Sequence, residues 1–458
     1  MKTLTIFCLL ALWLTEATTR SAGLLPIGVA KIDITPEGPI RLCGYASRTT
    51  ESEGVAGRLR ACAIAIGSDE DSPVLLITAE LVGVPESLVG PLARRLQKAG
   101  IDRSRLAICA THTHSGPCLA GFLNETHFSA YLPDDQMSRI KTYTSQLLDR
   151  LEEVALAALK DRKPRQLSWN QGEVSFAMNR RRLKDGKWVG FGRVPDGPVD
   201  HALPILQIRE SDGTLRAVLA NYACHCTTYT GKFNRIHGDW AGSAVRQIEQ
   251  RHPGGIAFIS IGCGADANPN PSGEVTGSKL VDGHGKAIAD EVDRLLAVDS
   301  LKLNSLPVCQ LRRINLPLDH VPSRAELTGR LKGGKRPAFY ARILLDKLDA
   351  GQTLPSSFTY PIQTWTFGDD LVMVFLAGEV VVDYAHRLKR ELNGKRLWIT
   401  AYANDAPGYI ASRRVIQEGG YEVDDSMNNY EKPTRLALDA EDLIINAVKQ
   451  LLPKPFTP

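Results

Sequence analysis

The chain has 458 residues, of which 43% are hydrophobic and 23% are charged, so it can bury a sizeable core and is not predominantly disordered. Lysine and arginine (55) nearly balance aspartate and glutamate (51), and the formal net charge is +4 without a long basic run. This balance disfavours nucleic-acid binding, which needs a concentrated cationic face. The composition also excludes collagen, a coiled coil and a multispan membrane protein.

The N-terminus has the pattern of a secretory signal peptide. Met1-Lys2-Thr3 precedes an apolar run over 4–14, and small and polar residues follow up to Gly23. That run is too short to cross ~30 Å of hydrocarbon as a helix, and the alternative is a buried N-terminal helix. We predict a signal peptide over 1–22, cleaved after Ala17 or Ala22, and a secreted or periplasmic protein. No second segment is apolar enough for a transmembrane anchor.

Cysteine usage agrees with export. Cys8 lies in the apolar run, which leaves eight cysteines in the mature chain. An even number in an exported protein permits disulfides, and we expect one or two. Several cysteines, such as Cys62 and Cys109, lie in strand-like runs where the thiol packs as a small hydrophobic group.

Short β-branched runs alternate with amphipathic stretches along the chain, which predicts an α/β fold with mixed β-sheets flanked by helices. Expected strands cover 27–34, 61–66, 74–78, 106–109, 205–208, 217–221, 256–261, 371–375 and 397–401. Expected helices cover 86–98, 137–159, 241–251, 286–297, 339–348, 380–392 and 440–451. The segment 317–355, rich in Lys, Arg and Gly, reads as a surface insertion, either a solvated face or a binding lid.

The loop after the strand at 106–109 carries two histidines. The string Thr-His-Thr-His at 111–114 places His112 and His114 two residues apart, on the same side of an extended segment. Imidazole is the commonest protein ligand for zinc. The pair favours a metal site or catalysis over a structural role.

A second polar loop follows the strand at 217–221. It contains His225, flanked by Cys224 and Cys226, and then Asp239 at the start of a helix. Adjacent residues on a strand alternate faces, so all three of 224–226 rarely reach one ion. Asp239 could equally be a helix N-cap.

Three further strand ends carry polar residues. A glycine-containing loop over 262–271 could form an oxyanion site or be only a turn. Glu379 follows the strand at 371–375, where a helix dipole would also favour it. Tyr409 and Tyr421 follow the strand at 397–401, in a loop that could simply face solvent. Ligands sit at the carboxyl ends of strands in open α/β sheets, so together these residues match the inventory of a mononuclear zinc hydrolase.

At these motifs the sequence resembles the N-terminal catalytic domain of the neutral (alkaline, non-lysosomal) ceramidase family. The resemblance begins at Gly-Val-Ala-Lys-Ile-Asp-Ile-Thr-Pro (28–36) and Gly44-Tyr45, and Thr-His-Thr-His-Ser-Gly-Pro (111–117) is its most specific part. It continues through segments that follow the family's order: Asn179-Arg180, His225, Gly238-Asp239, 268–270, 377–379, 403–409 and Tyr421-Glu422. Residues 23–458 then form one ceramidase-like zinc hydrolase domain.

The resemblance implies one zinc ion per chain. The ligands that it assigns are His112, His225, Glu379 and Tyr409. It also implies that His114, Arg180 and Tyr421 orient or polarise the scissile amide, while water activated by the zinc attacks the carbonyl carbon.

Two departures from the family bear on the substrate. Family members that hydrolyse ceramide carry a serine where this chain has Asn268, and an amide offers no hydroxyl. Cys263 could supply a nucleophile nearby or be a packed thiol, and neither its role nor that of Asp266 follows from the sequence. The family's C-terminal β-sandwich domain is also expected to be missing, since the sequence stops at Pro458, soon after Tyr421.

These observations leave three hypotheses. The first is an exported zinc amidohydrolase of lipid metabolism, acting on a small-molecule amide with the sphingolipid ceramide as the default substrate. The second is the same scaffold acting on a non-lipid amide or ester such as an N-acyl sugar. The third is a zinc-retaining binding protein without catalysis, which His114, Arg180 and Tyr421 argue against because a zinc holder needs no oxyanion partners.

Overall fold

The largest element of the fold is a nine-stranded mixed sheet. The computed structural model describes residues 23–272, 277–392 and 394–456, so the predicted signal peptide lies outside the described residues. The strand order is β10-β9-β8-β5-β1-β2-β3-β4, with β12 paired to β5. The pairs β3–β4 and β9–β10 at the two edges are parallel and the others are antiparallel. The strands are β1 (Leu25–Asp33), β2 (Arg60–Ile66), β3 (Val74–Ala79), β4 (Leu106–Ala110), β5 (Lys163–Glu173), β8 (Ala202–Arg209), β9 (Leu215–Tyr222), β10 (Ile256–Ile261) and β12 (Leu301–Lys302).

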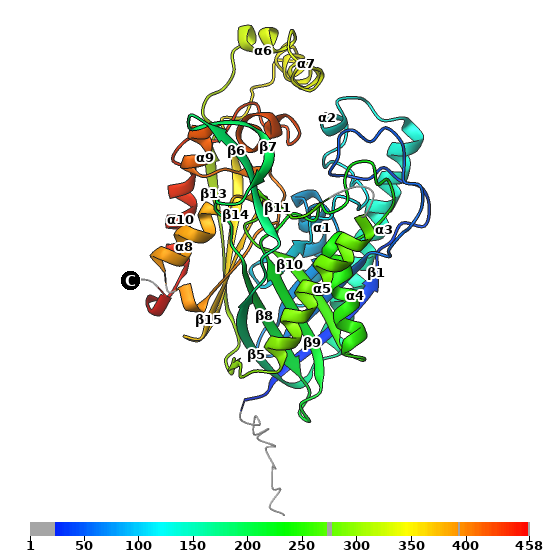
Figure 1. The fold of residues 1–458 in the computed structure, drawn as a ribbon, viewed down its shortest axis with the longest axis vertical. Helices are drawn as coiled ribbons and strands as arrows, with labels where there is room; N and C mark the ends of the chain where they lie inside the picture. Colours follow the sequence, from blue (N-terminus) through cyan, green and yellow to red (C-terminus); the bar gives the residue numbers. More distant parts are fainter. Residues whose placement is uncertain (1–22, 273–276, 393, 457–458) are drawn as a thin grey trace, which may run out of the picture.

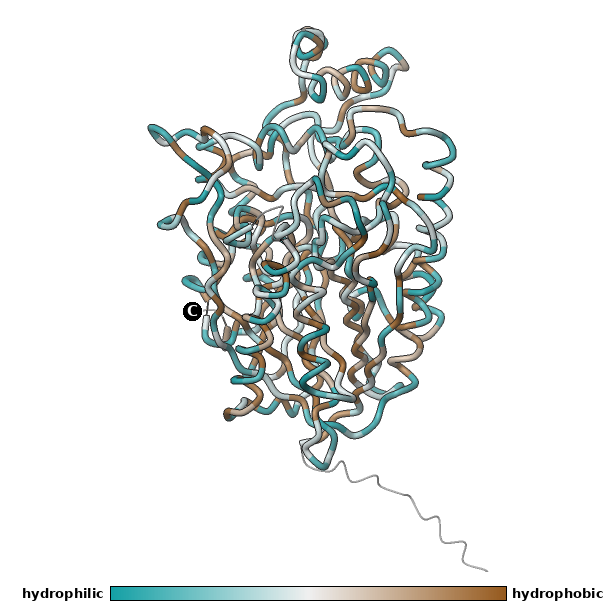
Figure 2. Tube along the Cα trace, turned by 45° about the vertical axis from the view of Figure 1, so that its right-hand side comes forward, coloured by the Kyte–Doolittle hydropathy of each residue, from teal (hydrophilic) through white to brown (hydrophobic). Residues whose placement is uncertain are grey.

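A second, four-stranded sheet packs against one face of the first. Its order is β13 (Val308–Pro317), β14 (Ser357–Phe367), β15 (Leu371–Leu376) and β17 (Leu397–Thr400). Side chains alternate across β2, so that Ile64 and Ile66 join Trp365 and Phe375 of the second sheet in one buried cluster. The intervening alanines of β2 face the opposite way, into the cluster that holds the helices. Figure 2 shows this hydrophobic interior along the strands of the body, beneath mostly hydrophilic outer loops.

Helices cover the outer face of each sheet, which makes four layers (Figure 1). On the large sheet, α3 packs on β1 to β3, α4 on β10, and α5 on β5 and β8. On the second sheet, α10 packs on β13 and β14, and α8 packs on α10. The bounds are α1 (Glu86–Gln97), α3 (Asp134–Lys160), α4 (Asp239–Arg251), α5 (Gly277–Leu296), α8 (Asp383–Glu391) and α10 (Ala440–Leu451).

The loops and small elements between the layers gather at the upper end of the molecule in Figure 1. The hairpin of β6 and β7 pairs with β11, and β16 pairs in parallel with β18. These elements are β6 (Ala177–Lys184), β7 (Lys187–Val194), β11 (Ala267–Pro269), β16 (Glu379–Val380), β18 (Tyr409–Ile410), α2 (Glu125–Phe128), α9 (Arg413–Glu418) and the turns η3 (Tyr421–Asp425) and η4 (Ser426–Asn428). Three further turns adjoin β4, β17 and α10: η1 (Arg103–Arg105), η2 (Gly394–Arg396) and η5 (Lys454–Phe456).

The segment 317–355 forms a helical pair above the sheets. Helices α6 (Arg324–Arg330) and α7 (Lys335–Asp349) stand at the top of the molecule in Figure 1. They share a small hydrophobic cluster of their own, made by Leu327, Tyr340, Leu344 and Leu354. The helix α7 also touches α2 and η4, so this segment reaches the loops at the upper end.

The mixed α/β prediction is confirmed, and each predicted strand and helix has a counterpart in the structure. The helix predicted over 380–392 begins later, at Asp383, because Glu379 and Val380 pair with Tyr409 and Ile410. The expected disulfides are wrong: all eight described cysteines are free, and all but Cys309 are buried. Cys62 and Cys109, for example, pack between the two sheets as small hydrophobic groups. Within the described residues, no helix has the length and apolar character to cross a membrane.

Candidate metal centre and active site

Three histidines from two strand ends meet at the upper edge of the large sheet. His112 and His114 follow β4 and His225 follows β9, and one nitrogen of each lies within 4.8 Å of the others. The Nε2 atoms of His112 and His114 are 3.0 Å apart. The predicted convergence therefore occurs, although His112 has a φ of 57° and is not extended.

Backbone carbonyls fix how two of these rings are protonated. Nδ1 of His112 lies 2.6 Å from the carbonyl oxygen of Val82, and Nδ1 of His225 lies 2.8 Å from that of Gly264. A carbonyl oxygen only accepts, so both Nδ1 atoms donate, and in the neutral tautomer each Nε2 then presents a lone pair. Burial, together with the nearby Arg180, lowers the pKa of His225 to about 4, so its ring is neutral at neutral pH.

Glu379 completes a set of three ligand atoms. Its Oε2 lies 3.2 Å from Nε2 of both His112 and His225, and it receives no hydrogen bond from any described residue. Burial works to raise the pKa of Glu379, and hydrogen bonds and positive charge from His112 and His225 hold it well below its usual range when these rings donate through Nε2. In the neutral tautomer with a proton on Nδ1, both rings instead present Nε2 lone pairs, and the carboxylate is repelled unless a cation lies between them.

The spacing of these atoms also suits a metal ion. Ligands placed 2.0–2.1 Å from a tetrahedral Zn²⁺ lie roughly 3.3 Å from one another. The two separations of 3.2 Å between Glu379 and the histidines agree with this value. His112, His225 and Glu379 thus fit a metal ion by both spacing and charge, and His114 offers a third imidazole.

Tyr409 lies beside this set because of strand pairing. The strands β16 and β18 pair in parallel with Glu379 opposite Tyr409. The Tyr409 hydroxyl is 3.5 Å from Nε2 of His225. Burial and the Glu379 carboxylate raise the pKa of Tyr409, while Arg180 opposes them.

Arg180, from β6, connects most of the predicted site residues. Its Nη1 lies 3.2 Å from Nε2 of His225 and donates to Oδ1 of Asn268 at 3.2 Å, and its Nη2 donates to the Tyr409 hydroxyl at 3.1 Å. Its Nε donates to Glu422 at 2.9 Å, and Glu422 also pairs with Arg181. Both Arg180 and Glu422 are buried, so this ion pair holds the guanidinium in one orientation.

Tyr421 lies at the start of a π-helical turn and presents its ring to Tyr409, at 5.5 Å between centroids. Its hydroxyl accepts a hydrogen bond from Asn429 at 3.4 Å. The turn depends on Gly420, which has a φ of 93° and leaves no room for a side chain, since a Cβ would lie 2.4 Å from the ring of Trp188. Turns of this kind are frequent at functional sites.

A cavity of about 430 Å³ opens onto this centre. Its lining includes His114, Arg180, Asn268, Tyr409 and Tyr421. The ligand set and the groups predicted to polarise a substrate therefore lie at one site, as expected for residues at the carboxyl ends of strands.

Other residues singled out in the sequence lie outside this site. Asp239 accepts hydrogen bonds from the backbone of Thr228, Tyr229 and Trp240, so it holds a loop together. Cys263 is buried, which raises the pKa of its thiol, and it does not line the cavity. Asp266 accepts the Val382 backbone N–H at 2.9 Å, and burial raises its pKa to about 7. All three have structural contacts.

Four residues near the centre were missed by sequence reasoning. Tyr430 donates its hydroxyl to Oε1 of Glu379, and the ring of Tyr402 packs 4.4 Å from that of His112. Glu422 holds Arg180, and His127 lines the cavity. Glu422 stood next to Tyr421 in the resemblance, but Tyr402, Tyr430 and His127 carry no motif that could have singled them out.

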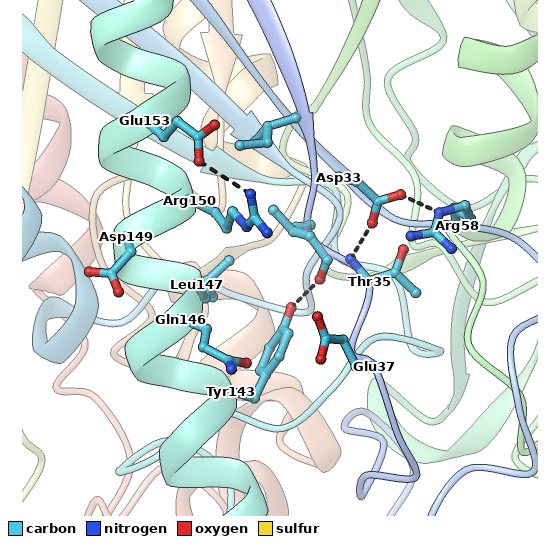
Figure 3. A pocket seen from close by; sticks show the side chains of 12 residues that line it. Asp33, Thr35, Glu37, Arg58, Tyr143, Gln146, Leu147, Asp149, Arg150 and Glu153 are labelled. Carbon is cyan, nitrogen blue, oxygen red and sulfur yellow. Dashed lines mark hydrogen bonds and ion pairs between the residues drawn. The ribbon is translucent and has the colours of Figure 1, made fainter.

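A second groove, between α3 and the end of β1, is separate from the centre (Figure 3). Its charged groups bind one another: Asp33 pairs with Arg58, and Arg150 pairs with Glu153. The Tyr143 hydroxyl donates to the backbone of Ile34. None of the predicted site residues lines this groove.

The fold and the site define a four-layer α/β protein with a buried centre of histidines and one carboxylate that could hold a metal ion. The family model for neutral/alkaline non-lysosomal ceramidase, N-terminal, matches residues 25–274. The chain therefore belongs to the neutral/alkaline non-lysosomal ceramidase family.

Individual relatives agree with this assignment. Neutral ceramidase from Pseudomonas aeruginosa is 26% identical over 256 residues, which cover 53% of this chain and 37% of that protein. The chain thus matches well under half the length of this curated relative. A crystal structure of neutral ceramidase from Pseudomonas aeruginosa aligns with a TM-score of 0.68 at 18% identity, covering 94% of this chain and 75% of that chain. A structure described as ceramidase complexed with C2 aligns with a TM-score of 0.70 at 16% identity, covering 94% and 76%. At these identities the two structures establish a shared fold.

Proposed function

We propose that this protein is an exported, zinc-dependent hydrolase that cleaves an amide bond, as neutral ceramidase (an N-acylsphingosine amidohydrolase) does. The observation that carries the proposal is the position of Glu379 Oε2, which lies 3.2 Å from the Nε2 atoms of both His112 and His225. In this proposal residues 1–22 are the signal peptide and residues 23–458 form the catalytic domain.

His112, His225, Glu379 and Tyr409 would hold one zinc ion per chain. Zn²⁺ in such a site supplies a Lewis acid that makes water nucleophilic near neutral pH. The half-buried Tyr430 hydroxyl donates to Oε1 of Glu379 and so leaves Oε2 directed at the histidines. The carbonyls of Val82 and Gly264 keep the two imidazoles in the tautomer that can bind the metal.

His114 would bind the substrate carbonyl as a hydrogen-bond donor. Burial and the neighbouring rings of His112 and His225 lower the pKa of His114 well below its usual value, so it is neutral at neutral pH. Its Nδ1 has no hydrogen-bond partner among the described residues. A neutral imidazole keeps one N–H, which can stabilise charge that develops on the carbonyl oxygen.

Arg180 would add a fixed positive charge at the same position. Its contact with the buried Glu422 prevents it from rotating away, and Asn268 accepts one of its N–H groups. Asn268 can donate through its amide but has no hydroxyl to act as a nucleophile, so no covalent intermediate is expected at this position.

Tyr421 would deliver a proton to the leaving amine. Burial is the largest cause that raises the pKa of Tyr421 to about 12, so the phenol keeps its proton at neutral pH. A protonated donor in contact with the cavity is what a poor leaving group such as an amine requires.

A substrate screen tests this proposal. The zinc-loaded protein is assayed with ceramides of short and long acyl chains, N-acyl glucosamines and short O-acyl esters, with release of fatty acid as the readout. The proposal is supported if the protein hydrolyses any of these amides, loses this activity when zinc is removed and regains it when zinc is added back. If none of these compounds nor any of the amides in the following subsection is cleaved while ligands still bind, the protein is a binding protein and the proposal is wrong.

A non-lipid amide is the second candidate substrate class. The observation that favours it is Asn268, which stands where the resemblance expects the serine of ceramide-cleaving members. Faster cleavage of N-acyl glucosamine than of any ceramide would support this candidate.

A further inference from the structure

Two residues of the cavity lining take no part in the proposed zinc chemistry. His127 comes from α2 and Arg336 from the first turn of α7, in the helical insertion. The two helices contact each other although they are about 200 residues apart in the sequence. Together they give the cavity a side that consists of polar groups, distinct from the metal ligands.

His127 is buried without any partner for its ring. Only 5% of the residue is exposed, and neither Nδ1 nor Nε2 has a hydrogen-bond partner among the described residues. Burial, with the charge of Arg336 as the next cause, lowers the pKa of His127 to about 3, so the ring is neutral with one donor and one acceptor. Buried polar atoms left unpaired are destabilising, and those that line a cavity are positioned to bind a ligand.

Arg336 is also unpaired, unlike Arg324 and Arg330 of the insertion. Within residues 23–272, 277–392 and 394–456, no hydrogen bond or ion pair to its guanidinium is formed, and its Nε is buried without a partner. By contrast, Arg324 pairs with Asp349, and Arg330 donates to the backbone of Pro433. The charge of Arg336 opposes the burial that raises the pKa of Asp425, but the two residues form no ion pair. The insertion thus places at the cavity a guanidinium that no described residue binds.

The rest of the lining combines polar and aromatic groups. It includes the unpartnered hydroxyls of Thr227 and Thr230 beside the rings of Phe191 and Tyr421. Among the described residues no Asp or Glu lines the cavity. The described part of the lining therefore offers one unpaired guanidinium and neutral donors, which suit an anion.

We propose that the substrate is an amide bearing an anionic group, a carboxylate or a phosphate, which Arg336 binds while His127 donates its ring N–H. This inference rests on the proposed hydrolase function, whose substrate class it specifies. The planar guanidinium binds either group through two parallel hydrogen bonds, which also fixes the orientation of the amide toward the metal centre. Ceramide has no charged group and would leave Arg336 and His127 unpaired.

Matched substrates test the inference. We compare kcat/KM for N-lauroylglycine with that for its uncharged carboxamide, and kcat/KM for ceramide 1-phosphate with that for ceramide. We expect the charged member of at least one pair to be preferred roughly 10- to 100-fold, and the preferred pair distinguishes carboxylate from phosphate. Equal or faster cleavage of the uncharged member in both pairs overturns the inference and leaves the proposed hydrolase function intact.

Variants then locate the preference. Arg336→Gln should reduce the charged-to-neutral ratio of kcat/KM roughly 10- to 100-fold, and Arg336→Lys should reduce it less because one charge remains. Arg342→Gln is the matched control, since Arg342 is exposed on the same helix and does not line the cavity. An unchanged ratio in Arg336→Gln contradicts the inference, and turnover of the neutral amide reports whether that variant folds.

A binding measurement separates this inference from the proposed function. The probe is 4-oxotetradecanoate, in which CH₂ replaces the NH of an N-acylglycine so that no amide can be cleaved, and its carboxamide is the uncharged partner. Calorimetry with the zinc-loaded protein should show tighter binding of the acid, and Arg336→Gln should remove the difference. If no amide is cleaved but this difference is found, the anion site stands and the hydrolase function fails. Equal binding of acid and carboxamide, with no preference for ceramide 1-phosphate, overturns the anion site.

Discussion

The two sides of the cavity differ in how their polar groups are satisfied. On the metal side, formed by His112, His225, Glu379 and Tyr409, every side chain is buried and held by neighbours that fix its orientation. On the insertion side, formed by His127 and Arg336, the polar groups have no partners among the described residues. This difference is what we expect if the metal side holds one ion, as proposed, and the insertion side binds part of a substrate.

Removing a metal ligand should have the largest effect. The change His225→Ala deletes one of the two fixed Nε2 atoms, and we expect it to abolish zinc retention and to lower kcat/KM by more than about 10³-fold. Zinc content by plasma mass spectrometry after dialysis is the measurement. The control is His252→Ala, a histidine that pairs with Asp293 away from the cavity. Full zinc occupancy in His225→Ala would show that the metal side is misassigned.

Changing a group that acts on the substrate should separate catalysis from metal binding. We expect Tyr421→Phe to retain zinc and to lower kcat by about 10²–10⁴-fold, because the proton donor is lost while the ring packing on Tyr409 remains. Steady-state kinetics and zinc content are measured together. Tyr131→Phe is the control, since Tyr131 is 74% exposed and outside the cavity lining. A Tyr421→Phe enzyme with unchanged kcat would remove Tyr421 from the mechanism.

A smaller effect is expected from displacing His114 without replacing it. Gly44 has a φ of 97°, and a Cβ there would lie 2.5 Å from Cγ of His114. We expect Gly44→Ala to push the imidazole away and to lower kcat on the order of tenfold while zinc is retained. Gly54→Ala is the control. Gly54 also has a positive φ, 117°, but no atom lies within 4 Å of the position that its Cβ would take. Similar losses in both variants would attribute the effect to backbone strain and not to His114.

The smallest effect is expected from a comparison of two buried glutamates, Glu379 and Glu80, whose Oε2 atoms both lack a hydrogen-bond partner among the described residues. His112 and His225 lower the pKa of Glu379, whereas burial raises the pKa of Glu80 to about 7 although Arg60 and Arg246 oppose it. A carboxyl whose pKa rises on folding stabilises the folded state. Its contribution to the free energy of unfolding is complete below the unfolded pKa of 4.5 and is lost as the pH rises through 7.

The Glu80→Gln variant lacks this titration. Between pH 5 and pH 8 the wild type should therefore lose roughly 2–3 kcal/mol of unfolding free energy relative to Glu80→Gln. Urea unfolding of both proteins at the two pH values is the measurement, and activity at pH 7 should change less than about twofold because Glu80 does not line the cavity. A difference in stability that is the same at both pH values would contradict the raised pKa.

The sequence predicted the apolar strands and the polar residues at their ends because both depend on local patterns. The ligand set His112, His225, Glu379 and Tyr409 followed from the resemblance and stays a prediction. Buried strands such as β3 and β10 are continuous apolar runs. It missed β5, β6 and β13, whose exposed faces carry Lys, Arg and Gln and interrupt the run. It also missed His127 and Arg336, since their meeting depends on contacts between distant segments that no local spacing encodes.

X-ray absorption spectroscopy of the purified protein, combined with its zinc content, tests the central claim most directly. We expect about one zinc per chain, with nitrogen and oxygen ligands at roughly 2.0–2.2 Å and an imidazole signature from two histidines. A protein that takes up no zinc would contradict this claim. So would a zinc site with sulfur at about 2.3 Å, which would point to Cys224 and Cys226 in place of Glu379 and Tyr409.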